Sequence, residues 1–175
     1  MTVDMAGPEI QAIHRVEYDA PEECTTLCAA ELPWNPTELA FMACAAAEVL
    51  PLGAGEAFSF YKKYLQLLTW QCPDVASSTW MLKCPFHLPY LEDLHAAFPG
   101  STVVWTHRHP VECVGSCCSL FEAILLLTID SWTLDRKALG REILNYIRIC
   151  LDRALKAIDK LSTLRVVHVK YTETT

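Results

Sequence analysis

Residues 102–120, TVVWTHRHPVECVGSCCSL, join a short apolar run, a basic turn and a helix opened by proline. The run 102–107 is rich in β-branched and aromatic residues, which predicts a buried strand. Pro110 stands where the first turn of a helix tolerates proline, and a helical pattern continues from it to about residue 129. Ligands of open α/β sheets bind at the carboxyl ends of strands, so this junction is a candidate site.

The junction carries the groups of an anion site. A helix N-terminus presents backbone N–H groups and the positive end of the helix dipole. Arg108 adds a planar, permanently charged fork that suits phosphate. Ser116 lies about two turns into the helix and reaches the same anion only if Arg108 extends along that helix face. We predict a phosphate site; the alternatives are an ion-paired surface arginine and a packed serine.

Strands and helices alternate around this unit. Helical patterns cover residues 21–33, 36–50, 56–71, 89–98 and 135–161, and strand patterns cover 79–83 and 164–171. On residues 56–71 the apolar side chains at helical spacing include Phe60, Tyr64, Leu67 and Leu68. Short strands separated by helices indicate βαβ units. We therefore expect one α/β domain over residues 1–175, with helices flanking a parallel sheet.

Composition excludes some functions. The formal charge of −7 argues against a general nucleic-acid binder, and 52% apolar residues can bury a core. Neither a signal peptide nor an apolar run of about 20 residues is present, so a soluble cytoplasmic protein is expected.

The nine cysteines include no CxxC pair, although Cys24/Cys28 and Cys113/Cys117 are spaced by one helical turn. We interpret them as small buried apolar residues of a reducing compartment and expect no metal site. His95, His107 and His168 are interpreted as ordinary helix or sheet residues.

Residues 79–120, TWMLKCPFHLPYLEDLHAAFPGSTVVWTHRHPVECVGSCCSL, resemble the sulfotransferase family. They are most similar to its bacterial-type and lower-eukaryotic branch, which has a W-L-L-K-S-P-x-H-L strand and a T-H-R-D-P-x-x-x-x-x-S loop. HRVEYDAPEEC (14–24), FYKKYLQLLTW (60–70) and RVVHVKYTE (165–173) resemble that branch too. The resemblance implies a P-loop-NTPase-like parallel sheet and the donor 3′-phosphoadenosine 5′-phosphosulfate, with no metal.

The resemblance also implies roles for four residues. Arg108 and Ser116 occupy the positions that bind the donor's 3′-phosphate, and Lys83 matches a lysine near the transferred sulfuryl group. A cation there stabilises charge that develops during transfer. His87 is the candidate general base for a hydroxyl or amine acceptor on a small molecule, glycan or peptide; other candidates, each with a structural alternative, are His14, Glu22 and Glu23.

The sequence departs from the family pattern in two places. His109 stands where the family has aspartate, and no glycine-, serine- and threonine-rich turn for the 5′-phosphosulfate precedes His14. The first strand is missing with that turn, and the chain stops just after its last strand, so we expect a fold incomplete at both ends. Low or no transferase activity of this chain alone is expected. The alternative is a non-catalytic nucleotide-binding or scaffold module; a third interpretation, an NTP-using enzyme, lacks a Walker sequence.

Overall fold

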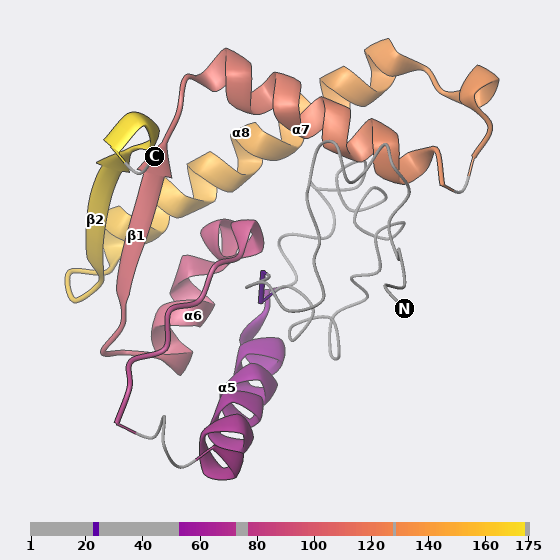
Figure 1. Ribbon diagram of the computed structural model, residues 1–175. Coiled ribbons are helices and arrows are strands. Elements are labelled where there is room, and N and C mark those ends of the chain that lie inside the picture. Colours follow the sequence, from indigo (N-terminus) through magenta and orange to yellow (C-terminus); the bar gives the residue numbers. More distant parts are fainter. Residues whose placement is uncertain (1–22, 25–52, 73–76, 128, 174–175) are drawn as a thin grey trace.

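The computed structural model describes residues 23–24, 53–72, 77–127 and 129–173 (Figure 1). Its helices are α5 (Gly55–Gln71), α6 (Leu91–Ala97), α7 (Pro110–Leu125) and α8 (Arg136–Lys160), its strands are β1 (Thr102–His107) and β2 (Arg165–Lys170), and short 3-10 helices are η3 (Pro85–Tyr90), η4 (Ser131–Thr133) and η5 (Tyr171–Glu173). The helices predicted over residues 21–33 and 36–50 lie outside the described residues.

The two strands confirm the parallel sheet. β1 and β2 pair in parallel, with Val103 opposite Val166 and Trp105 opposite His168, and the chain passes between them through α7 and α8 (Figure 1). β1 begins and ends at the predicted residues, because its β-branched run is bounded by Pro99-Gly100 before it and by Pro110 after it. The α/β fold class is therefore confirmed.

The predicted burial of β1 is wrong for one face of the strand. Val103 and Trp105 pack against a small core around Leu91, Ala154 and Ala157, whereas the side chain of Val104 is 62% exposed. An apolar strand is buried on both sides only where helices or sheets cover both faces. In the part of the chain that the structure describes, α6 and α8 cover one face.

Helix α8 organises the main core. Asp135 caps its N-terminus by accepting hydrogen bonds from the backbone N–H groups of Lys137 (2.9 Å) and Ala138 (3.0 Å). Its buried side chains recur every three or four residues, which forms a continuous apolar stripe: Leu139, Ile143, Tyr146, Cys150, Ala154 and Ala157. This stripe packs against η3 and α7 and confirms the helix predicted over 135–161.

Helix α5 buries the face beside the residues that the helical spacing singled out. Its buried side chains are those of Ala57, Phe58, Tyr61 and Leu65, whereas Phe60 and Tyr64 are half-buried and Leu67 is exposed. Apolar residues lie on two adjoining faces of this helix, and only tertiary packing selects between them.

The strand predicted over residues 79–83 is wrong. This segment has no regular secondary structure and belongs to no sheet among the described residues, and Met81 is 97% exposed. Its backbone is instead tied to a distant segment, because the carbonyl of Lys83 accepts a hydrogen bond from the N–H of Cys24 (3.0 Å). The helix predicted to follow it divides into η3 and α6, since Pro89 lies inside the first of them.

Candidate functional site

Arg108 leaves the carboxyl end of β1 and lies against the first turn of α7. Its Nε donates to Oε2 of Glu112 at 2.7 Å, and its guanidinium stacks on the ring of Tyr171 at 5.2 Å from the ring centroid. The hydrogen bond to Glu112 raises the pKa of Arg108 above its ordinary value. Two contacts from different elements therefore orient this charged group although it is exposed.

Ser116 lies on the same side of α7 as the Arg108 side chain. Residues four apart on a helix share a face, so Glu112 and Ser116 follow one another along one face. Because Arg108 binds Glu112, its side chain lies at the N-terminal end of that face, one helical turn before Ser116. Ser116 is exposed, and the N-cap residue His109 makes no side-chain capping hydrogen bond to the first turn.

Lys83 forms an ion pair with Glu23, a residue 60 positions earlier in the sequence. The Lys83 side chain is 71% exposed, whereas that of Glu23 is 21% exposed. Glu23 was one of the candidate bases, and this ion pair places it beside the predicted cation. The other two, His14 and Glu22, lie outside the described residues.

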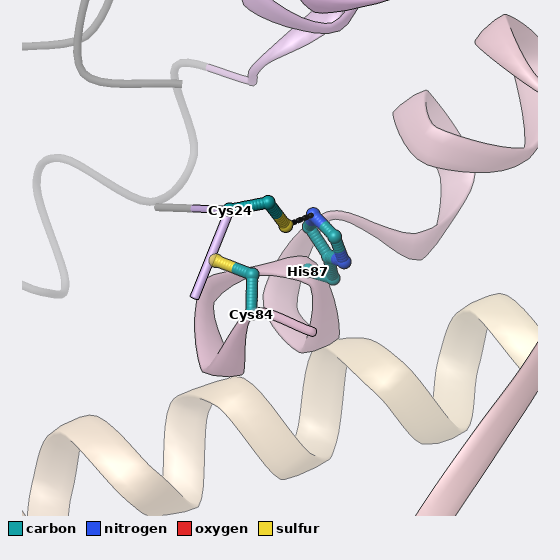
Figure 2. A group of neighbouring side chains, drawn as sticks. All are labelled: Cys24, Cys84 and His87. Atoms are coloured by element: carbon teal, nitrogen blue, oxygen red, sulfur yellow. Dashed lines mark hydrogen bonds between the residues drawn. The ribbon is translucent and has the colours of Figure 1, made fainter. Parts of the chain in front are cut away.

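His87 belongs to a group of three metal-ligating side chains. Cys24 Sγ lies 3.8 Å from His87 Nε2, and one ligand atom from each of Cys24, Cys84 and His87 lies within 4.8 Å of the others (Figure 2). Cys84 and His87 come from the start of η3, and Cys24 comes from a distant segment, as Figure 2 shows. Phe58 and Tyr61 of α5 pack near the imidazole, with ring centroids 5.8 and 6.2 Å away.

The environments of the cysteines differ. A hydrogen bond with Cys84 is the largest cause that lowers the pKa of the Cys24 thiol well below its ordinary 9.0, helped by His87 and opposed by burial. At Cys117 and Cys150 burial is the largest cause instead. It raises the thiol pKa of Cys117 to about 12 and that of Cys150 to about 11. The interpretation of small buried apolar residues therefore suits Cys117 and Cys150 best, whereas Cys72 is exposed.

The predicted site residues fall into two separate groups. Arg108 and Ser116 lie at the junction of β1 and α7, which Figure 1 shows away from the indigo segment that holds Cys24. Lys83 and His87 lie beside that segment, through Glu23 and Cys24. A shallow hollow at the end of α7, lined by Leu126, Leu127, Ile129, Asp130 and Thr133, includes none of the predicted residues.

Sequence reasoning missed several neighbours of the site. Tyr171 contacts Arg108 from η5, and no motif connects the two. His107 and His168, read as ordinary strand residues, stack with their ring centroids 4.9 Å apart, and His107 Nε2 lies 2.7 Å from His168 Nδ1. The ends of β1 and β2 meet because the two strands pair in parallel. The contact between His107 and His168 could therefore be predicted from the strand register, and no motif indicates it.

The parallel pairing of β1 and β2, joined through helices, defines the class of this protein as an α/β fold. A family model described as "Sulfotransferase family" matches residues 5–175. The chain therefore belongs to the sulfotransferase family, whose members transfer sulfuryl groups, and the resemblance is confirmed. Neither a curated protein nor a solved structure matches the chain significantly. Among the described residues, each helix is too short or too polar to cross a bilayer.

Proposed function

We propose that this protein transfers a sulfuryl group from 3′-phosphoadenosine 5′-phosphosulfate to a hydroxyl or amine acceptor. Family membership supports the transfer, and the orientation of Arg108 supports the nucleotide donor. The observation that carries the proposal is the contact of the Arg108 guanidinium, at the end of β1, with Glu112, which lies one helical turn before Ser116 on α7. The donor's 3′-phosphate would bind there.

The 3′-phosphate would replace Glu112 as the partner of Arg108. An exposed ion pair one helical turn apart contributes little to stability, so its loss opposes binding only weakly. A phosphate offers more charge and accepts two parallel hydrogen bonds from the guanidinium. The Ser116 hydroxyl and the first N–H groups of α7 would donate to the remaining oxygens.

Lys83 and His87 would act at the other end of the donor. A nucleotide that carries its 3′-phosphate and its sulfuryl group at opposite ends suits two separate groups of residues. As the acceptor oxygen or nitrogen bonds to sulfur, its proton would pass to His87. The bond from sulfur to the phosphate oxygen would break, and Lys83 would stabilise the negative charge on that leaving oxygen.

Calorimetric titration with 3′-phosphoadenosine 5′-phosphate tests the nucleotide site, with adenosine 5′-monophosphate as the control ligand. We expect binding that requires the 3′-phosphate, and Arg108→Ala should weaken it roughly 10- to 100-fold because a charge-assisted contact is lost. Arg148→Ala is the matched control, since Arg148 is also exposed and also pairs with an acid four residues later, Asp152. The affinity of the Arg148→Ala variant for 3′-phosphoadenosine 5′-phosphate should match that of the wild type.

Two results would contradict the proposal. Equal affinity of the wild-type chain for the two nucleotides would show that no 3′-phosphate site exists. Unchanged affinity of a folded Arg108→Ala variant would show that the site lies elsewhere. Absence of nucleotide binding to the folded protein would favour the alternative, a scaffold module with the same fold.

A further inference from the structure

We propose that Cys24, Cys84 and His87 form a zinc site in which two thiolates and one imidazole bind the ion. Three ligand atoms, one from each residue, already lie within 4.8 Å of one another (Figure 2). This inference goes beyond the proposed function and does not depend on it.

The geometry suits tetrahedral zinc. Bonds of about 2.3 Å to sulfur and about 2.0–2.1 Å to nitrogen at a tetrahedral angle place sulfur and nitrogen about 3.6 Å apart, and two sulfurs about 3.8 Å apart. Cys24 Sγ and His87 Nε2 are 3.8 Å apart in the structure. Small side-chain rotations would therefore bring the three atoms to bonding distance of a common centre.

The chemistry of the three ligands selects the ion. Thiolate and imidazole are the ligands that zinc prefers, whereas magnesium and calcium prefer oxygen. Two thiolates and a neutral imidazole balance the charge of a divalent ion, which suits a site where Cys24 is buried and the other two residues are half-buried. Water would complete the tetrahedron at the fourth position.

The surroundings allow the Cys24 thiol to lose its proton. The Sγ–H of Cys24 now donates to the carbonyl of Lys83 at 3.2 Å, and deprotonation removes that donor. The carbonyl stays satisfied, because it also accepts from the N–H of Cys24 at 3.0 Å.

Zinc here would join distant parts of the chain. Cys24 is 60 residues from Cys84, so the ion would fix the segment of Glu23 and Cys24 onto the start of η3. Glu23 pairs with Lys83 in that segment, so the ion would also hold this pair in place. With zinc bound, His87 Nε2 is a ligand, so the role of His87 as a base belongs to the metal-free protein alone.

Cobalt(II) titration of the reduced, metal-free protein tests the site. We expect one equivalent to produce a sulfur-to-cobalt charge-transfer band and the visible d–d bands of tetrahedral cobalt, and zinc to displace it. Cys84→Ser and His87→Gln should each lose most of the tetrahedral spectrum. The matched controls Cys72→Ser, an exposed cysteine, and His95→Gln, a histidine of α6, should keep it.

X-ray absorption at the zinc edge of the wild-type protein keeps the test decisive if a variant does not fold. We expect two sulfur ligands at about 2.3 Å and two nitrogen or oxygen ligands at about 2.0–2.1 Å. Four sulfur ligands, or none, would overturn the proposal. A wild-type protein that shows no tetrahedral cobalt spectrum would also overturn it. If folded Cys84→Ser or His87→Gln variants kept the wild-type spectrum, the ion would be an adventitious one on other cysteines, and the proposal would be wrong.

Discussion

The Nε of Arg108 lies 2.7 Å from Oε2 of Glu112, one helical turn into α7. The contact holds the guanidinium against the first turn of α7, on the helix face that Glu112 shares with Ser116. Glu112 therefore orients Arg108 and also occupies the place that a bound phosphate would take.

Glu112→Gln should tighten the binding of 3′-phosphoadenosine 5′-phosphate by a few-fold. The amide can still accept a hydrogen bond from Arg108, but it removes a negative charge that competes with the phosphate. Calorimetry at low salt measures the change, and added salt should reduce it by screening. Glu142→Gln, a partly exposed acid on α8, is the control. Weaker nucleotide binding by Glu112→Gln would contradict this, because it would mean that Glu112 helps binding more by orienting Arg108 than it hinders binding by competing with the phosphate.

Ile143→Ala should destabilise the protein by roughly 2–5 kcal/mol, because it leaves a cavity in a packed core. The side chain of Ile143 is 0% exposed on the inner face of α8, whereas that of its neighbour Leu144 is 56% exposed. Leu144→Ala is therefore the matched control and should cost less than about 0.5–1 kcal/mol. Denaturant unfolding of both variants measures the difference. Equal losses would mean that α8 packs through another face.

Asp135→Ala should lower the melting temperature by about 2–4 °C, because the first turn of α8 loses its N-cap. The same truncation at Asp159, near the other end of α8, should be neutral or stabilising, since a negative charge there opposes the helix dipole.

The effect of the Asp135 cap should depend on pH. Hydrogen bonds from Ala138 and Lys137 lower the pKa of the Asp135 carboxyl below its ordinary 3.8. A carboxyl whose pKa is lower in the folded chain than in the unfolded chain stabilises the fold at pH values above its unfolded-state pKa. This contribution is lost as the pH falls through the folded-state pKa. The difference in melting temperature between the wild type and Asp135→Ala should therefore shrink below pH 3.8. A difference that grows on acidification would contradict the cap.

Stability should fall as the pH rises above about 9, the ordinary pKa of a thiol. Burial raises the pKa of Cys117 to about 12 and that of Cys150 to about 11, so these thiols stay protonated in the folded chain while the unfolded chain ionises. A thiol whose pKa is higher in the folded chain than in the unfolded chain stabilises the fold at pH values below its unfolded-state pKa. That contribution is lost as the pH rises through the folded-state pKa.

Cys117→Ala tests this effect by denaturant unfolding at a series of pH values. The variant should show a shallower decline in the free energy of unfolding between pH 9 and 11 than the wild type. Cys72→Ala is the control, because Cys72 is exposed, and its slope should match the wild type. Identical slopes in Cys117→Ala and the wild type would mean that Cys117 is not desolvated.

The sequence by itself determined the local elements with strong patterns. The β-branched run of β1, the proline that opens α7 and the aspartate that caps α8 act on their neighbours in the chain, so these boundaries were predictable. The parallel pairing of β1 and β2 was also predictable, because helices joined two short strands.

Tertiary structure decided which apolar face was buried and which distant residues met. Phe60 and Phe58 are equally apolar, but Phe58 packs in the main core, where its ring lies 5.8 Å from the His87 ring of η3. The segment 79–83 has the residues of a strand but no neighbour in the described sheet, and strand pairing cannot be encoded by one segment alone. Cys24 meets Cys84 and His87 across 60 residues of chain, so no local spacing could reveal that group.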